Sequence, residues 1–179
     1  PEPEDVFIEN GRIVSVGLLS GVADADVIDA AGMLVMPGLV NAHFHSPVNH
    51  MKGALPSLPL ELFMLYESPA NEALRPTPRE AYVRTLLACL EMIRNGVTAV
   101  QDDAFFVPYP EPAIIDAVLQ AYEDSGLRAR VALDQSDVAE ADKLPFLDQI
   151  MNDNQRRRLA VKPKVGSEQL LEMYDHLIS

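Results

Sequence analysis

An alternation of apolar strand patterns with amphipathic helix patterns constrains the fold of this chain more than any other feature. Apolar runs predict buried strands at 38–45, 97–103 and 127–134. Apolar residues at helical spacing separate these strands, at 77–96 and at 112–126. Strands that alternate with helices pair in parallel, because a right-handed helical crossover connects each strand to the next. The sequence therefore predicts an α/β fold built on a parallel sheet.

The helix expected at 77–96 has clear signals at both ends. Thr77 suits the N-cap, Pro78 suits the first helical position, and Glu80 can accept a hydrogen bond from the Thr77 amide, which completes a capping box. Gly96 suits the left-handed residue that follows a helix. The helical spacing predicts one buried apolar stripe, which comprises Val83, Leu86, Leu87, Leu90 and Ile93.

Three more segments have helical character. Residues 58–68, LPLELFMLYES, predict a short and strongly apolar helix. Residues 141–158 are ambiguous and favour a helix with a charged, solvated end. Residues 167–179 predict an amphipathic helix in which Ser167 is the N-cap and His176 is a surface residue.

Residues 1–36 predict a small antiparallel β unit. DVFIENGRIVSVG alternates apolar and polar residues around Asn10-Gly11, a pair typical of a hairpin turn. ADVIDAAGMLVMPG predicts a second short strand pair around Ala31-Gly32. The chain is therefore expected to divide into residues 1–36 and residues 37–179.

Two parallel-sheet architectures compete, a doubly wound open sheet and an eight-stranded (β/α) barrel. A doubly wound nucleotide-binding domain needs a glycine-rich turn after its first strand. Here the first expected strand runs into NAHFHSPVNH (41–50), which contains no glycine. The barrel is therefore favoured, and in that fold the chemistry lies at the C-terminal ends of the strands.

His43 and His45 stand at such a strand end. Residues i and i+2 of a strand project to the same side, about 6.6 Å apart along the strand. Two imidazole nitrogens placed in this way can bind one metal ion at about 2.0–2.1 Å each. The alternative is a pair of core histidines that hydrogen-bond to the backbone, and spacing and position alone leave both possibilities open.

The net charge and the short length of the apolar segments argue against several classes of partner. Lys and Arg number 14 and Asp and Glu number 27, so the formal net charge is −13, which disfavours nucleic acids and anionic membranes. No apolar segment reaches the ~18 residues that span a bilayer.

The single cysteine, Cys89, is expected to be a core residue in a reducing cytoplasm. The acidic start, PEPEDVF, lacks an initiator Met and a basic signal region, and we interpret it as an interior cut or a processed end.

The stretch around the histidines resembles a known family. Residues 27–53, VIDAAGMLVMPGLVNAHFHSPVNHMKG, are similar to the metal-dependent amidohydrolase superfamily, above all to its branch of cytosine, guanine and adenosine-type deaminases and triazine hydrolases. In that branch a PGLVNAHTH segment ends the first barrel strand. This chain has Phe44 in place of that threonine, and Asn49, His50 and Lys52 replace the usual threonine, leucine and arginine.

The resemblance implies a fold and a cofactor. Residues 1–36 would be part of a small β-sandwich domain, and residues 37–179 the first third to half of a (β/α)8 barrel, with about three β/α units. His43 and His45 would hold a divalent ion, Zn²⁺ or Fe²⁺, which activates water to hydrolyse a ring or imino C–N bond. The remaining metal ligands and a proton-shuttling glutamate are expected beyond residue 179, so the catalytic residues stay unknown.

The resemblance also suggests roles for residues near the histidines. Asn49 and His50 are expected in the loop that faces a small-molecule substrate. Asp102, at the end of the second barrel strand, is expected to accept a hydrogen bond from a ring nitrogen of a metal ligand, or else to cap the next loop. Asp103 faces the other way, because adjacent strand residues point to opposite sides, so the two aspartates are not an acid/base pair.

Two alternatives to a ring deaminase stay open. A cyclic-amidase or dihydroorotase-type enzyme with a binuclear site needs a carboxylated lysine on a fourth strand, and a non-catalytic structural piece needs no site at all. In each case about three β/α units leave two open sheet edges. We therefore expect association with the missing part of the barrel or with a second copy, or marginal stability. We expect no turnover by these residues alone, and a homo-oligomeric parent protein.

Overall fold

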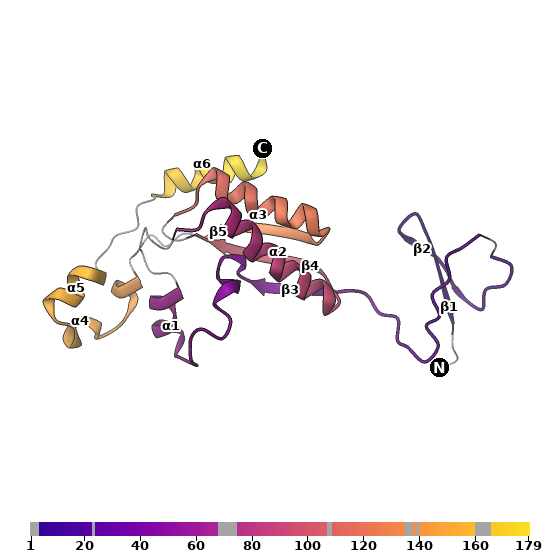
Figure 1. Cartoon of the computed structure of the whole chain (residues 1–179), viewed down its shortest axis with the longest axis horizontal. Helices are drawn as coiled ribbons and strands as arrows, with labels where there is room; N and C mark the ends of the chain where they lie inside the picture. The colour runs from indigo at the N-terminus through magenta and orange to yellow at the C-terminus, as the bar shows by residue number, and fades with distance from the viewer. Residues whose placement is uncertain are drawn as a thin grey trace. The chain divides into compact units, whose positions relative to one another are not determined.

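The computed structural model describes residues 4–22, 24–67, 75–106, 109–134, 138, 140–159 and 166–179. Its internal contacts divide the chain into two compact units, Pro1–Pro37 and Gly38–Ser179. Figure 1 shows the helices and strands of both units.

The first unit contains one β-hairpin. Strands β1 (Asp5–Glu9) and β2 (Arg12–Gly17) pair in antiparallel fashion. The turn between them places Asn10 at φ 50° and Gly11 at φ 73°. Two successive residues in the left-handed region match the right-handed twist of a hairpin, so the predicted hairpin around this pair is confirmed.

The second strand pair expected in this unit is wrong. A turn forms at the predicted place, where the Met33 amide donates to the Ala30 carbonyl at 2.9 Å, but no strand lies within the described residues 24–36. The apolar side chains on both sides of the turn stay open to solvent, with Val27 88% and Leu34 83% exposed. A short strand pair needs a third strand or a packed face for stability, and the described part of this unit offers neither.

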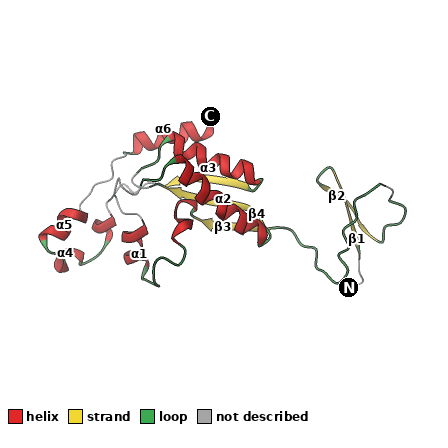
Figure 2. Ribbon diagram, in the orientation of Figure 1, coloured by secondary structure: helices red, strands yellow, loops and turns green. Residues whose placement is uncertain are grey.

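The second unit contains a three-stranded parallel sheet in the order β3-β4-β5. Its strands are β3 (Leu39–Phe44), β4 (Val97–Phe105) and β5 (Arg128–Asp134). Helices α2 (Pro78–Arg94) and α3 (Pro112–Ser125) run along one face of this sheet (Figure 2). The predicted α/β fold with parallel strands is therefore confirmed for this unit.

The ends of the helices follow their sequence signals, with one exception. The Thr77 hydroxyl accepts from the Glu80 amide at 3.2 Å, and the Glu80 carboxylate accepts from the Thr77 amide at 2.7 Å, so the predicted capping box is present. Gly96, after α2, has a φ of 79°. The exception is α6 (Ser167–Ile178), whose N-cap is Gly166 and not Ser167, because the Gln169 side chain accepts from the Gly166 amide at 3.1 Å.

Shorter helical elements complete the second unit. The helix α1 (Leu60–Glu67) forms within the predicted apolar segment. The segment 141–158 does not form one helix but breaks into pieces, since Pro145 cannot continue a helix and Phe146 has a φ of 67°. The pieces are η3 (Glu140–Lys143), α4 (Leu147–Ile150) and α5 (Asp153–Leu159). A further short helix, η1 (Ser46–Met51), follows β3.

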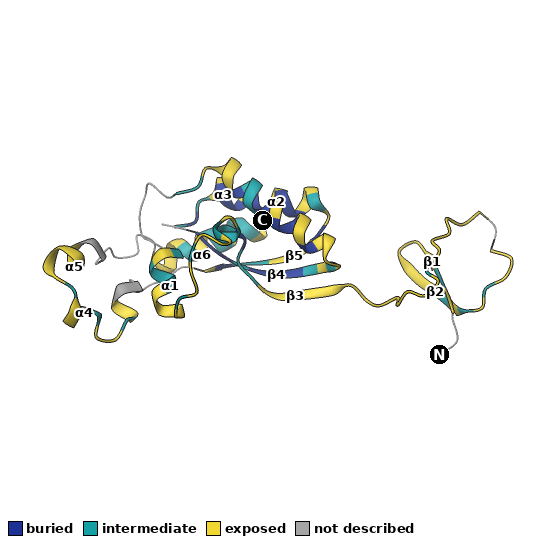
Figure 3. Cartoon of the chain, turned by 60° about the horizontal axis from the view of Figure 1, so that its bottom comes forward, coloured by how far each residue is buried: buried dark blue, intermediate teal, exposed yellow. Residues whose placement is uncertain are grey.

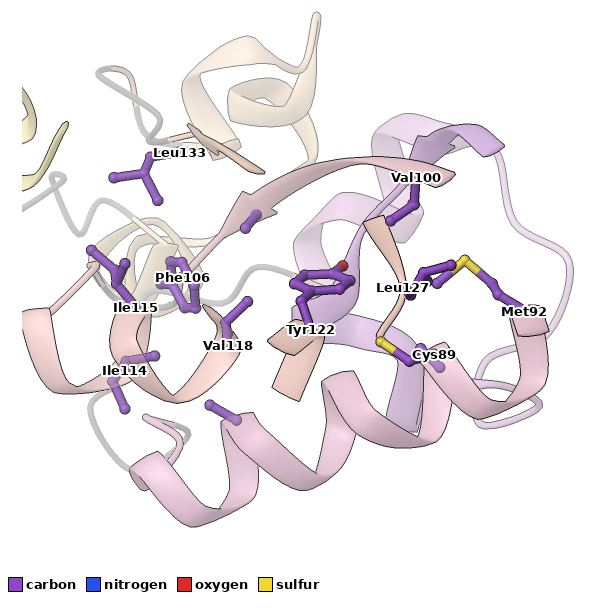
Figure 4. Close-up of a cluster of buried hydrophobic side chains, with 13 residues drawn as sticks. Cys89, Met92, Val100, Phe106, Ile114, Ile115, Val118, Tyr122, Leu127 and Leu133 are labelled. Carbon is purple, nitrogen blue, oxygen red and sulfur yellow. The ribbon is translucent and has the colours of Figure 1, made fainter. Parts of the chain in front are cut away.

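The core of this unit lies between the sheet and the helices α2 and α3 (Figure 4). Cys89 is fully buried there, as predicted. The apolar stripe predicted for α2 is wrong, because Leu87 is 56% exposed and Leu90 49% exposed. Figure 3 shows both buried and exposed residues along α2. The buried face of α2 carries smaller side chains instead, which let the helix approach the sheet closely. They are Ala81, Thr85, Ala88 and Cys89, with Met92 at the end.

Among the helices that the structure describes, none combines the length and apolar character that crossing a bilayer requires.

Candidate metal centre

A bulge in β3 sets the direction of the two histidines. Between Asn41 and Phe44 the register of β3 against β4 shifts by one residue. Within the bulge the His43 amide donates to the Asn41 side-chain oxygen at 3.2 Å. Phe44 packs against the hydrophobic core. His43 and His45, its two chain neighbours, therefore share the opposite side of the strand, away from the core.

The two imidazole rings converge through one nitrogen each. Nε2 of His43 lies 3.2 Å from Nε2 of His45, and the rings meet edge to face at an interplanar angle of 84°. Two ligand nitrogens at Zn–N distances of 2.0–2.1 Å and a tetrahedral angle lie about 3.3 Å apart. The pair therefore has the separation that two imidazoles bound to one ion require.

The other ring nitrogen of His45 is anchored. Nδ1 of His45 lies 2.8 Å from the main-chain oxygen of Asp103, and the Asp103 carboxylate is 3.9 Å away. A carbonyl oxygen only accepts, so Nδ1 carries the proton and Nε2 presents its lone pair. The Phe105 ring packs beside His45 with 5.4 Å between ring centroids and limits its rotation. Both contacts favour the tautomer and orientation of a metal ligand.

Asp102 holds the backbone that follows His45. Its side chain is fully buried, and its carboxylate accepts from the Ser46 amide at 2.9 Å and from the Tyr122 hydroxyl at 2.8 Å. Burial raises the pKa of Asp102, and the hydrogen bonds from Ser46 and Tyr122 lower it. Burial and the Asp102 carboxylate together raise the pKa of Tyr122. The acceptor beside the His45 ring is thus the Asp103 carbonyl, while Asp102 ties the turn after His45 to α3.

A cavity of about 180 Å³ opens beside this turn. His50 lines it, and Nδ1 of His50 lies 3.2 Å from the Pro47 carbonyl oxygen within the same turn. Asn49, its neighbour, points elsewhere: the Asn49 amide donates to the Arg84 carbonyl of α2 at 3.5 Å. Phe105 lines the cavity and also packs on His45, so the cavity and the histidine pair share one wall.

Two charged residues of the cavity were not predicted from the sequence. Glu67 ends α1 and Arg84 lies on α2, and both line the cavity. Burial raises the pKa of Glu67, and the nearby His45 lowers it. Burial lowers the pKa of Arg84. No short sequence pattern links either residue to the histidines, because helix packing alone brings them to the cavity.

Within the described residues, no third His, Cys, Asp or Glu joins the histidine pair to make a larger ligand cluster. Zinc in proteins takes four ligands in structural sites, and three with a water in catalytic sites. A complete centre therefore requires ligands from outside the part of the chain that the structure describes. His176 plays no part in the pair, since its ring contacts Asp116 of α3 at 2.7 Å. Its side chain is 35% exposed and that of Asp116 is 61% exposed, so His176 lies at the surface, as predicted.

Known proteins match most of this chain. A 5′-deoxyadenosine deaminase from Methanosarcina mazei is 40% identical over 71% of the chain, and the match spans 27% of that protein. A 5-methylthioadenosine/S-adenosylhomocysteine deaminase from Thermococcus kodakarensis is 39% identical over 69% of the chain and 29% of its own length. The chain thus spans under a third of the length of these two relatives.

A solved structure matches the fold. A mutant atrazine chlorohydrolase from Arthrobacter aurescens TC1, complexed with zinc and atraton, superposes with a TM-score of 0.62 at 28% identity, over 74% of this chain and 31% of its own. Residues 34–176 match the amidohydrolase family. This range includes both histidines and all three strands of the parallel sheet. The chain belongs to the amidohydrolase family.

Proposed function

We propose that this chain supplies part of the metal centre of a metal-dependent hydrolase that releases ammonia or an amine from a C–N bond of a small molecule. The observation that carries the proposal is the convergence of His43 and His45, with 3.2 Å between their Nε2 atoms, at the C-terminal end of a parallel strand. Their donor chemistry and separation fit a divalent ion, and zinc is the ion in the related chlorohydrolase structure.

The proposal includes the larger architecture. The three parallel strands, with helices on one face, are the start of a (β/α)8 barrel, and the hairpin of the first unit is part of a small β-sandwich domain. The rest of the barrel supplies the missing metal ligands and the proton-shuttling carboxylate. The 179 residues alone are then inactive, because they hold at most two ligands of the ion.

Each residue near the pair has a distinct task in this scheme. His43 and His45 bind the ion through Nε2, and the Asp103 carbonyl fixes the His45 tautomer. Asp102 holds the turn after His45 in place. When bound, the ion supplies an activated water for attack on an electron-poor carbon.

The substrate class follows from the relatives. Their names describe the deamination of 5′-deoxyadenosine, of 5-methylthioadenosine and of S-adenosylhomocysteine. We therefore propose an adenine-containing nucleoside as substrate. Water replaces the exocyclic amino group of the adenine ring, a C–O bond forms as the C–N bond breaks, and ammonia leaves with the proton that the water gives up.

Ammonia release from 5′-deoxyadenosine by the full-length protein tests this proposal. Zinc-loaded protein should release ammonia with a matching change in adenine absorbance. Chelation should abolish the reaction, and added zinc should restore it. His45→Ala should lower the rate by at least a hundredfold, whereas His176→Ala, on α6 and outside the site, should leave it within a few-fold. Turnover that survives chelation or the His45→Ala change would contradict the proposal.

A further inference from the structure

The cavity beside the histidine pair is lined by two charged residues of opposite sign, Glu67 and Arg84. Glu67 and Arg84 are both half-buried in its walls. Neither makes an ion pair with any residue that the structure describes. The charges that act on them do so without a direct ion pair: His45 acts on Glu67, and Glu80, one turn earlier on α2, acts on Arg84. Half-buried charges without a direct ion-pair partner are costly, so a ligand that brings the opposite charges is favoured there.

The remaining walls of the cavity are mostly apolar. Phe105 and Phe106 come from the end of β4, and Pro47, Val48 and Met51 come from η1. An apolar cavity with a few convergent polar groups is the usual form of a small-molecule site. Its charges therefore act at a reduced dielectric, where pairing with a ligand is stronger than in water.

The size and position of the cavity indicate which part of a substrate it receives. Its volume of about 180 Å³ is below the 300–1,000 Å³ or so of sites for whole drug-sized ligands, so it suits a substituent. Phe105 packs on His45 and lines the cavity, so a ring that reacts at the histidine pair lies next to the cavity mouth.

We propose that this cavity binds the zwitterionic amino-acid tail of a substrate whose ring reacts at the histidine pair. Arg84 pairs with the tail carboxylate, and Glu67 accepts hydrogen bonds from the tail ammonium. The proposal rests on the ring deamination proposed above and adds a preference among its substrates. S-adenosylhomocysteine carries such a tail, whereas 5′-deoxyadenosine ends in a methyl group.

His50 also lines the cavity and affects how the tail carboxylate binds there. Burial and the neighbouring Arg84 charge lower the pKa of His50, which disfavours a second positive charge beside Arg84. Nδ1 of His50 lies 3.2 Å from the Pro47 carbonyl oxygen, and a neutral His50 ring adds no positive charge beside Arg84. The carboxylate of the tail therefore depends on Arg84 for its charged partner.

Calorimetric binding to metal-free, full-length protein tests the proposal, because without metal no turnover consumes the ligand. The wild type should bind S-adenosylhomocysteine at least tenfold more tightly than 5′-deoxyadenosine. Arg84→Gln and Glu67→Gln should each weaken S-adenosylhomocysteine on the order of tenfold and leave 5′-deoxyadenosine within about twofold. Arg79→Gln, an arginine on the same helix outside the cavity, is the matched control and should change neither affinity.

Other results would overturn the tail site. The first is that the wild type binds the two nucleosides with equal affinity. The second is that Arg84→Gln weakens the binding of both nucleosides equally, and the third is that it weakens the binding of neither. Thermal unfolding of each variant separates a folding defect from a lost contact, and Arg84→Lys, which keeps the charge, should recover part of the S-adenosylhomocysteine affinity.

Failure of the proposed function has a different signature. If the wild type binds neither nucleoside, the nucleoside substrate is wrong, and L-methionine at millimolar concentration then tests the tail site by itself. L-Methionine should shift the side-chain Nε–H signal of Arg84 in ¹⁵N-labelled protein, the signal that Arg84→Gln removes. No shift would overturn the tail site even in that case.

Discussion

Asp102 is a carboxylate placed where water does not reach it. Its side chain is fully buried, and both of its hydrogen bonds come from neutral donors, the Ser46 amide and the Tyr122 hydroxyl. Burial raises its pKa above the ordinary 3.8. The charged form of Asp102 is therefore disfavoured in the folded state relative to the unfolded chain, although the same residue holds the turn that follows His45.

The two substitutions Asp102→Asn and Asp102→Ala separate these effects. The raised pKa means that the folded state binds more protons than the unfolded state between 3.8 and the folded pKa, so this group's contribution to stability falls as the pH rises through that window. Asp102→Asn removes the titration. Its amide oxygen can still accept from the Ser46 amide, and its NH2 can donate to the Tyr122 hydroxyl, so its stability relative to wild type should increase from pH 4 to pH 7. Asp102→Ala should lose about 1–3 kcal/mol for each donor left unpaired, at both pH values.

Denaturant unfolding at the two pH values measures both variants. If the stability of Asp102→Asn relative to wild type decreases as the pH rises, burial does not disfavour the charged form of Asp102. Loss of zinc in Asp102→Ala with retention in Asp102→Asn would further indicate that the hydrogen bonds, and not the charge, position His45.

The sequence alone predicts the direction of some side chains but not the contacts of others. The shared direction of His43 and His45 follows from the period of a strand, which is a local property. The partners of Asp102 do not follow, because Tyr122 reaches it from α3, 20 residues away along the chain. Glu67 and Arg84 were missed for the same reason, since helix packing and not sequence spacing brings them together.

At the scale of elements, local end signals predict better than apolar stripes do. The capping box of α2 and the left-handed Gly96 depend on a few adjacent residues, and both form as expected. The stripe of α2 depends on which neighbours cover it. Leu87 and Leu90 point to solvent in the described structure, while the face with small side chains packs on the sheet.

The N-caps of α2 and α6 offer a paired test. Thr77→Ala removes the hydroxyl that accepts from the Glu80 amide, so it should lower the free energy of unfolding by about 1 kcal/mol. Ser167→Ala should change it by less than about 0.5 kcal/mol, because Gly166, not Ser167, is the N-cap of α6. Equal losses in the two variants, measured by urea unfolding, would contradict these cap assignments.

At the scale of the whole molecule, the second unit is a sheet with unfinished edges. In the order β3-β4-β5, the described residues give β3 and β5 a strand on one side only. Exposed edges of this kind pair readily with other strands. This part of the fold could be predicted from the strand and helix pattern, whereas the partner strands could not, since no further strand pairs with β3 or β5 among the described residues.

The 179 residues expressed alone should therefore associate. Size-exclusion chromatography with light scattering should find species larger than the 19.7 kDa chain, and Lys substitutions on the β5 edge should reduce them. A monodisperse monomer would show that the open edges are stable in water.

Zinc content measures most directly whether His43 and His45 bind one ion together. In full-length protein, mass spectrometry of the metal should find about one zinc per chain, and His43→Ala and His45→Ala should each lose most of it. His50→Ala and His176→Ala, which change histidines outside the pair, should keep the wild-type content. Full zinc content in both His43→Ala and His45→Ala would contradict the shared metal site.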